Sequence, residues 1–174
     1  MRICSIIGHK DAGKTTLLVA LAREFHRQGK RVASIKHASH PALIDHEGSD
    51  TWRHFNEGCT ERTLIASPDM RALFERAPDT IDPETLARTY MGGVDLVLVE
   101  GFKRAPLPKV EVYRKVLGHP PLIASSDANP SDWIAIVTDD ASLRADCRVL
   151  RFTDTMWLSL LAALILERAK VLSP

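Results

Sequence analysis

The sequence has little that would direct it to a membrane, a secreted scaffold or a nucleic acid. Its most apolar stretch, Met156–Leu166, is too short to cross a bilayer. The net charge is only +1 with 26% charged residues, so no broad basic face is expected for nucleic acid or an anionic membrane. We therefore expect no nucleic-acid partner and no membrane partner.

Cysteine is also scarce, with three residues that are far apart in the chain, and an odd number cannot all pair internally. This usage favours free thiols in a reducing compartment. An apolar run begins at Ile3, which leaves no room for a signal peptide. We expect a cytoplasmic protein with no disulfide framework.

The strongest positive signal is the pattern Gly-x-x-x-x-Gly-Lys-Thr, which runs from Gly8 to Thr15. An apolar strand candidate precedes it and an apolar helical pattern follows it, which is the context of a P-loop. Gly8 and Gly13 allow backbone N–H groups to converge on a phosphate. Lys14 is expected to reach the β- and γ-phosphates, and the Thr15 hydroxyl to bind Mg²⁺.

The whole loop is therefore predicted to cradle the phosphates of a nucleotide. The residues assigned to this cradle are Gly8, His9, Lys10, Asp11, Ala12, Gly13, Lys14, Thr15 and Thr16.

Strand and helix candidates alternate along the rest of the chain, which predicts an α/β P-loop NTPase with a mainly parallel sheet covered by helices on both faces. We expect a single nucleotide-binding domain over residues 1–174. The helices expected after the P-loop helix are Asp50–Glu57, Pro68–Phe74, Pro83–Met91 and Asp154–Lys170, and the main strands are Arg31–Lys36, Thr60–Ala66, Asp95–Gly101, Lys109–Arg114 and Trp133–Val137.

A P-loop needs a partner acid at the end of a neighbouring strand, and Glu100 follows the apolar run of residues 96–99. Asp95 is at the other end of that strand, some 16 Å away, and is a poor candidate. Thr15 and Glu100 are therefore the predicted metal ligands. We assign catalytic roles to Lys14, Asp50 and Glu100.

A second polar stretch extends from Lys36 to His40 and from Asp45 to Asp50. It could line the nucleotide, with Lys36 and His37 in contact with it and Asp50 at Mg²⁺ or a water molecule. It could instead be a solvated loop, or His37, His40, His46 and Cys59 could form a transition-metal site. The residues alone leave these alternatives open.

Three cations, Lys103, Arg104 and Lys109, follow Glu100 in a proline-containing segment. Such cations suit an anionic second ligand or a partner, although a plain surface loop is an alternative. Asp139 and Asp140 follow a late strand, where guanine-reading carboxylates often lie. They favour guanine over adenine only weakly.

Three stretches together resemble the molybdopterin-guanine dinucleotide biosynthesis adaptor proteins, the MobB family. They are Gly8–Thr16, Lys36–His40 with Gly48-Ser49-Asp50 and Asn56-Glu57-Gly58, and Asp95–Lys103 with Pro108–Glu111. The likeness extends over roughly residues 1–115 in order and spacing.

This resemblance implies a GTP-binding homodimer with weak GTPase activity that uses Mg²⁺. It would assist the guanylyltransferase that joins GMP to molybdopterin, and a molybdopterin-type ligand could bind as well. Two positions depart from the family pattern: Ser49 stands where a lysine is usual, and Lys10 comes one position too late to serve as a trans-acting lysine.

Two other functions share parts of these signals. A nickel-inserting metallochaperone GTPase would use the histidine cluster. An ATP-dependent kinase or ligase resembling dethiobiotin synthetase would share the P-loop and a strand that ends in Val99-Glu100-Gly101. Metal binding would distinguish the first, and adenine preference the second.

Overall fold

The structure is a computed structural model that describes residues 1–38, 45–77 and 82–173. The chain forms two compact units. The first comprises Met1–His37 and Asp82–Pro174, and the second comprises Ala38–Ile81. The single domain expected over residues 1–174 stays a prediction.

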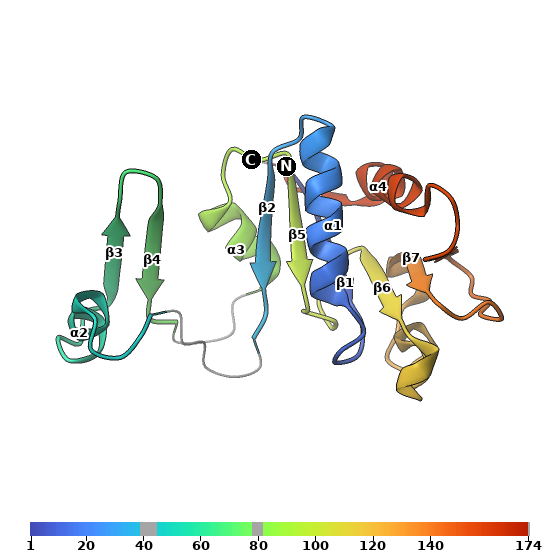
Figure 1. Cartoon of the computed structure of the whole chain (residues 1–174), viewed down its shortest axis with the longest axis horizontal. Helices are drawn as coiled ribbons and strands as arrows, with labels where there is room; N and C mark the ends of the chain where they lie inside the picture. The colour runs from blue at the N-terminus through green and yellow to red at the C-terminus, as the bar shows by residue number, and fades with distance from the viewer. Residues whose placement is uncertain (39–44, 78–81, 174) are drawn as a thin grey trace. The chain divides into compact units, whose positions relative to one another are not determined.

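The first unit is built on one sheet with the strand order β2-β5-β1-β6-β7-β8 (Figure 1). All neighbours along this path are parallel, and β9 pairs antiparallel with the start of β1. The bounds are β1 (Arg2–Ile7), β2 (Val32–Lys36), β5 (Leu96–Glu100), β6 (Lys109–Tyr113), β7 (Trp133–Thr138), β8 (Arg148–Arg151) and β9 (Lys170–Val171). The mainly parallel sheet predicted from the alternation of elements is confirmed.

Helices cover both faces of this sheet. On one face α1 (Lys14–Arg27) and α4 (Trp157–Arg168) pack on the strands, and Leu21, Phe25 and Leu161 are fully buried there. On the other face α3 (Pro83–Tyr90) buries Ala87 against β2 and β5. Because both faces are covered, β5 consists of buried residues throughout, as a central parallel strand requires.

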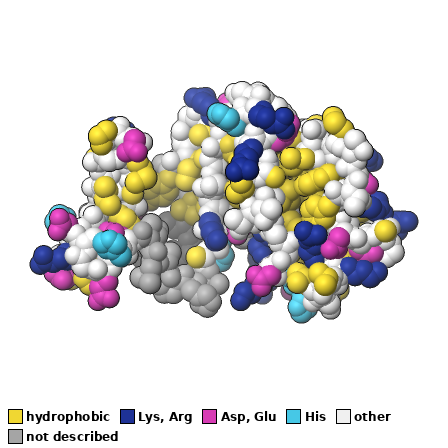
Figure 2. Space-filling view, viewed as in Figure 1, with side chains coloured by type: hydrophobic (Ala, Val, Ile, Leu, Met, Phe, Trp, Pro, Cys, Tyr) yellow, Lys and Arg dark blue, Asp and Glu magenta, His cyan; other side chains and the backbone are white. Residues whose placement is uncertain are grey.

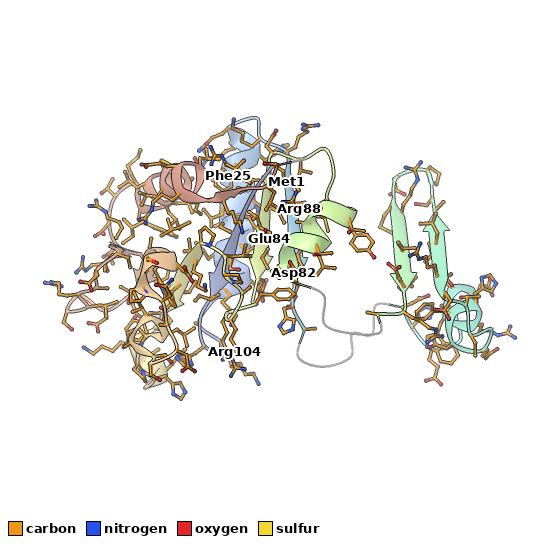
Figure 3. The ribbon with its side chains drawn as sticks, turned by 180° about the vertical axis from the view of Figure 1, so that it is seen from behind. Met1, Phe25, Asp82, Glu84, Arg88 and Arg104 are labelled. Carbon is orange, nitrogen blue, oxygen red and sulfur yellow. The ribbon has the colours of Figure 1, made fainter. Side chains whose placement is uncertain are left out.

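The start of α3 follows from its local sequence. The Asp82 carboxylate accepts hydrogen bonds from the backbone N–H groups of Glu84 and Thr85, and Pro83 occupies the first turn. The hydrogen bonds from Thr85 hold the pKa of Asp82 below its ordinary value. Arg88, on the same helix, donates to the Ser173 carbonyl (Figure 3).

On the α3 face of the sheet, β6 and β7 are covered by short 3₁₀ segments rather than by a long helix. These are η2 (Leu122–Ala124) and η3 (Pro130–Asp132), while η1 (Lys115–Leu117) follows β6. Leu122 and Ile123 pack on a cluster that includes Ile7, Trp133 and Ile136. This packing creates the walls of a cavity that is considered below.

The second unit contains α2 (Asp50–Asn56) and a hairpin of β3 (Arg62–Ala66) and β4 (Arg71–Glu75). Ser49 caps α2 by accepting from the Trp52 N–H, as its sequence predicts. Leu64 and Leu73 are cross-strand partners and are 60% and 47% exposed. Figure 2 shows hydrophobic side chains over this hairpin.

The helix expected over Pro68–Phe74 is wrong. The Ser67 N–H instead donates to the Met70 carbonyl at 2.8 Å, which closes a turn, and β4 then pairs antiparallel with β3. Ladder hydrogen bonds to a neighbouring strand override the helix propensity of the Arg-Ala-Leu-Phe-Glu segment.

Among the helices of residues 1–38, 45–77 and 82–173, none is long and apolar enough to span a bilayer.

Candidate functional site

The P-loop connects the carboxyl end of β1 to the first turn of α1. Gly8 lies at the start of the loop with φ +151°, and a Cβ at this position would meet the Val112 carbonyl oxygen at 2.5 Å. Gly13 precedes α1 with φ +99° and brings no side chain to cap the helix. The first-turn N–H groups of α1 therefore face no capping side chain, which suits an anion at this positive helix end.

Lys14 closes this loop on itself. Its ammonium group donates a 2.7 Å hydrogen bond to the His9 carbonyl. The Ala12 carbonyl accepts from Arg114 Nε at 3.4 Å, so β6 supports the loop from its other side. Lys10 and Asp11 are exposed, and Asp11 adopts a positive φ of 61°. The cation predicted to bind phosphate is thus held across the loop by a carbonyl that a ligand could replace.

Glu100 brings the second half of the site to the P-loop. The Thr15 hydroxyl donates to Glu100 Oε2 at 2.9 Å, and Lys36 Nζ lies 3.7 Å from Glu100 Oε1. Strand register explains the arrangement, because Glu100 aligns with Lys36 on β2 and with Ile6 on β1, two positions before Gly8. Only 10% of the Glu100 side chain is exposed. The two predicted metal ligands are therefore adjacent, and their metal role stays a prediction.

His37 lies beside the backbone at the end of β5. Its backbone N–H donates to the Glu100 backbone carbonyl at 2.9 Å, and its ring centroid is 4.5 Å from that of Phe102. A Cβ at Gly101, where φ is +97°, would approach the His37 Cβ at 3.0 Å. Gly101 thus permits the strand end, the imidazole and the following loop to come together. Lys36 and His37 both lie at this edge, as the sequence suggested, and their contact with nucleotide stays a prediction.

Asp50, the third predicted catalytic residue, belongs to the second unit and is the first residue of α2. Its neighbour Ser49 donates to Asp45 Oδ2 at 2.6 Å while capping the helix. The catalytic assignment of Asp50 stays a prediction.

The suggested transition-metal site is spread over both units. His37 is in the first unit, His46 and Cys59 are in the second, and His40 lies outside the described residues. Within residues 1–38, 45–77 and 82–173, no group of three or more His, Cys, Asp or Glu side chains is arranged to hold a metal ion.

Asp139 and Asp140 follow β7, where a base-reading carboxylate was considered, and both already have protein partners. Asp139 accepts from the Lys115 N–H at 3.0 Å and pairs with Arg114 at 3.3 Å. Asp140 accepts from the N–H and hydroxyl of Ser142, and these bonds hold the pKa of Asp140 below its ordinary value. The two carboxylates, which follow β7, thus connect this segment to Arg114 and Lys115, which follow β6.

Sequence reasoning missed two buried charges in β6. Lys109 is 3% exposed and donates to Asp132 at 2.8 Å and to the carbonyls of Ala105 and Leu107. Glu111 is fully buried and accepts from the Trp133 indole N–H at 2.8 Å. The sequence signal that could have indicated this burial is the alternation of Lys109 and Glu111 with valines in an otherwise apolar strand.

Glu111 also organises the segment beyond β6. Its two carboxylate oxygens accept from the backbone N–H groups of Leu122 and Ile123, at 2.5 and 3.2 Å. A buried carboxylate is costly unless such donors surround it. Glu111 therefore holds η2 against the sheet.

Comparisons with known proteins identify the family of this chain and agree with its fold. Residues 3–139 match the family model described as molybdopterin guanine dinucleotide synthesis protein B. The molybdopterin-guanine dinucleotide biosynthesis adapter protein of Haemophilus influenzae is 35% identical over 68% of this chain and 66% of its own length. That of Escherichia coli is 33% identical over 82% of this chain and 80% of its own length.

A putative adapter protein of Methanocaldococcus jannaschii is 30% identical over 84% of this chain, and the match spans 58% of that relative. The chain therefore spans less than two thirds of the length of some relatives that it matches. The crystal structure of Bacillus subtilis MobB superposes with a TM-score of 0.73 at 24% identity, over 98% of this chain and 99% of that one, which shows the shared fold.

A solved structure of molybdopterin-guanine biosynthesis protein B has a TM-score of 0.67 at 25% identity, over 95% of this chain and 98% of the other. The family match extends from the first strand past the end of β7 and includes both the P-loop and Glu100. The chain belongs to the molybdopterin guanine dinucleotide synthesis protein B family.

Proposed function

We propose that this chain binds GTP and Mg²⁺ at its P-loop, hydrolyses GTP slowly, and acts as an adapter for the guanylyltransferase that joins GMP to molybdopterin. Family membership supports the pathway, because the matched relatives carry the name of molybdopterin-guanine dinucleotide biosynthesis adapter proteins. The arrangement of the P-loop and Glu100 supports nucleotide binding.

The observation that carries the proposal is the 2.9 Å hydrogen bond between the Thr15 hydroxyl and Glu100 Oε2. It joins a P-loop hydroxyl to the acid of a neighbouring strand, and Mg²⁺ prefers hard oxygen ligands of this kind. These two donors are a hydroxyl and a carboxylate, which suit a hard cation better than the softer metals that thiolates select. The residues therefore fit Mg²⁺, which would neutralise charge on the phosphate oxygens.

The remaining roles belong to the loop and the adjacent strand. The N–H groups that begin α1 and the Lys14 ammonium would bind phosphate oxygens, with Lys14 exchanging its bond to the His9 carbonyl for the ligand. Lys36, whose ammonium lies 3.7 Å from Glu100 Oε1, would orient that carboxylate. Each of these groups positions or neutralises, and none takes a proton from water.

Slow GTP hydrolysis is consistent with the way three carboxylates of the first unit are already engaged by protein partners. Glu100 is already engaged by Thr15 and Lys36, and Asp139 and Asp140 are bound by Arg114, Lys115 and Ser142. None of these three carboxylates is free to act as a general base, and a hydrolase that relies on electrostatic positioning alone is slow.

We extend the proposal to a homodimer. A two-stranded hairpin is marginal in water unless its apolar face is covered. In the second unit, Leu64, Met70 and Leu73 are 60%, 58% and 47% exposed. Burying such side chains against a second copy would stabilise the hairpin. Sedimentation of the purified protein tests this: a monomer at micromolar concentration would contradict the dimer.

The central experiment is a binding panel of GTP and ATP, with and without Mg²⁺, on the purified full chain. We expect Mg²⁺-dependent binding that favours GTP. The adapter role is tested separately, by adding the protein to a guanylyltransferase reaction at limiting GTP. More dinucleotide product with the parent than with Lys14→Ala supports the proposal, and equal product contradicts it.

A further inference from the structure

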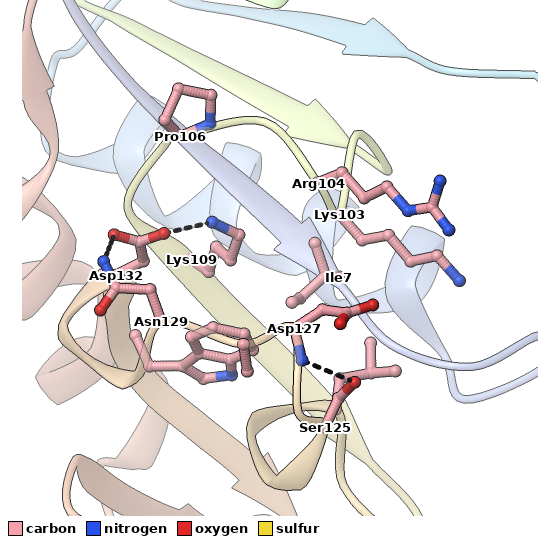
Figure 4. A pocket seen from close by; sticks show the side chains of 12 residues that line it. Ile7, Lys103, Arg104, Pro106, Lys109, Ser125, Asp127, Asn129 and Asp132 are labelled. Atoms are coloured by element: carbon pink, nitrogen blue, oxygen red, sulfur yellow. Dashed lines mark hydrogen bonds and ion pairs between the residues drawn. The ribbon is translucent and has the colours of Figure 1, made fainter.

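A cavity of about 640 Å³ lies on the face of the sheet opposite α1. Its walls come from the end of β1, the loop after β5, the start of β6 and the segment between β6 and β7 (Figure 4). The volume is in the range of small-molecule sites. No step of the proposed nucleotide chemistry uses this cavity.

The inner wall is apolar. Ile7 and Trp133 are 1% and 4% exposed, and Leu122, Ala128 and Pro106 complete this part of the lining. The indole N–H of Trp133 is satisfied by Glu111, so the ring presents no unpaired donor. Leu122, Ala128 and Pro106, which are partly or fully exposed, therefore supply most of the apolar surface that a heterocycle could contact.

Two cations border the cavity. Lys103 and Arg104 are exposed, and neither forms a hydrogen bond or ion pair with any residue that the structure describes. Figure 4 shows the two side chains extending in the same direction from the loop. Lys109, the third cation of this segment, is buried and paired with Asp132, so it has no charge to offer a ligand. The free charge therefore comes from Lys103 and Arg104 alone, which suits a phosphate.

The cavity also contains a carboxylate with free acceptor capacity. Asp127 is exposed, and among the described residues its side chain receives only a 3.4 Å hydrogen bond, from the adjacent Ser126 hydroxyl. Asn129 and Asp132, by contrast, are bonded to each other at 3.2 Å and to Ser131 and Lys109. Asp127 can accept from the amino and ring N–H groups of a heterocycle.

We propose that this cavity binds a phosphorylated nitrogen heterocycle, with the ring on the apolar wall, its donor edge at Asp127 and its phosphate at Lys103 and Arg104. Phosphorylated pterins and guanine nucleotides share this chemistry. We expect the ligand to be a pterin because of the proposed function. Only this choice between a pterin and a guanine nucleotide rests on that function.

The cavity is lined by residues that are close in sequence to the proposed nucleotide site. Lys103 follows the P-loop partner Glu100 by three positions, and Ile7 immediately precedes Gly8. The cavity therefore begins near the carboxyl ends of β1 and β5, on the face of the sheet opposite α1, and extends to the amino ends of β6 and β7. In open α/β sheets, the edge at the carboxyl ends of the strands is where ligands bind.

The test uses the full chain carrying Lys14→Ala, so that the P-loop does not compete for phosphate. Neopterin monophosphate and neopterin form a matched pair of fluorescent probes that differ only in the phosphate, and GMP is the guanine competitor. We expect saturable binding of neopterin monophosphate, monitored by fluorescence anisotropy, and displacement by GMP only at higher concentration. Displacement at equal or lower concentration assigns the cavity to guanine nucleotides and overturns the pterin assignment.

Lys103→Ala with Arg104→Ala should weaken neopterin monophosphate at least about tenfold and leave neopterin almost unchanged, because only the phosphate meets these cations. The matched control removes two exposed cations elsewhere, Arg23→Ala with Lys30→Ala, and should change neither affinity. Equal affinity of the phosphate probe in the parent and the Lys103/Arg104 variant would overturn the site.

Asp127→Asn separates a built site from simple anion attraction. Removing a negative charge would strengthen the binding of any anion that is held only by the local field. If Asp127 accepts from the ring, the change should instead weaken both probes about tenfold. Stronger probe binding after Asp127→Asn contradicts the proposal, and so does a failure of either probe to saturate the Lys14→Ala chain. If the chain with Lys14 unchanged still binds GTP in that case, the proposed function is unaffected.

Discussion

The Thr15 hydroxyl donates to Glu100 Oε2 at 2.9 Å, although 85 positions separate the two residues in the chain. Thr15 begins α1 and Glu100 ends β5, so the contact forms only when β5 pairs with β1. It brings the P-loop and its partner acid into one site.

Replacing Lys14 with alanine should weaken nucleotide binding strongly and preserve the fold. The ammonium group bonds only to the His9 carbonyl in the part of the chain that the structure describes, so its loss exposes little core. A charge-assisted hydrogen bond to phosphate contributes about 1.5–3 kcal/mol, so GTP affinity should fall about 10-fold or more. Calorimetric titration measures the affinity, with Lys30→Ala, which removes an exposed cation outside the P-loop, as the control. Unchanged GTP affinity in Lys14→Ala would refute the site.

Changing Glu100 to glutamine should weaken the Mg²⁺ dependence of binding more than nucleotide binding itself. The amide keeps the shape of the side chain but loses the charge that a divalent ion prefers. GTP titrations across a range of Mg²⁺ concentrations measure this effect. Asp95→Asn, at the other end of the same strand, is the matched control. The same Mg²⁺ dependence in Glu100→Gln and the parent would argue that Glu100 is only structural.

Gly8→Ala should destabilise the first unit because its Cβ would meet the Val112 carbonyl oxygen at 2.5 Å. Overpacking of this kind costs about 1–3 kcal/mol. Gly29→Ala is the control, because its φ of +74° adds backbone strain but its Cβ would meet nothing within 4 Å. Urea denaturation should show a larger loss of unfolding free energy for Gly8→Ala. Equal losses would mean that the contact with Val112 is readily relieved.

Lys109→Met should lower the free energy of unfolding substantially. Lys109 is 4% exposed on its side chain, Asp132 is 27% exposed, and their atoms are 2.8 Å apart. Removing one partner of a buried pair costs about 3–5 kcal/mol, and the partial exposure of Asp132 favours the lower end. The exposed pair of Arg53 and Glu57 provides the control, because Arg53→Ala should cost under about 1 kcal/mol. A similar small loss for Lys109→Met would disprove a structural role for this cation.

Thiol reactivity should distinguish the three cysteines. Burial raises the pKa of Cys4 from 9.0 to about 12 and that of Cys147 from 9.0 to about 11, whereas Cys59 is exposed. At pH 8 iodoacetamide should therefore modify Cys59 first in the folded protein and all three after unfolding. Mass spectrometry of peptides measures the order, and early modification of Cys4 would contradict it.

The same pKa values set the sign of a stability change at high pH. The unfolded thiols lose their protons near pH 9, while the folded ones keep them to about 11 and 12. Stability is thus unaffected by these thiols below pH 9 and falls as the pH rises above it.

Much of the P-loop is predictable because its signals are local. The glycine positions, the apolar strand before them and the helix after them lie within one short stretch. The same holds for the caps at Ser49 and Asp82, where the side chain bonds to the backbone of the next few residues. Such interactions need no information about distant parts of the chain.

Other features depended on pairing between distant segments. Residues 71–75 form a strand rather than a helix because β3 offers them a ladder. Lys109 reads as a third exposed cation in the sequence, yet sheet formation buries it and Asp132 pairs with it. Of the three cations in this segment, only Lys103 and Arg104 are therefore available to bind an anionic ligand.

The sequence by itself predicted the mainly parallel α/β architecture, the glycine-rich loop between β1 and α1, and Glu100 as the acid that lies next to this loop. Only the tertiary structure decided that Glu111 and Trp133 hold η2 against the sheet and so create a cavity beside Lys103 and Arg104. The physical reason is range: propensity and capping act over a few residues, whereas burial and strand register depend on which distant residues meet.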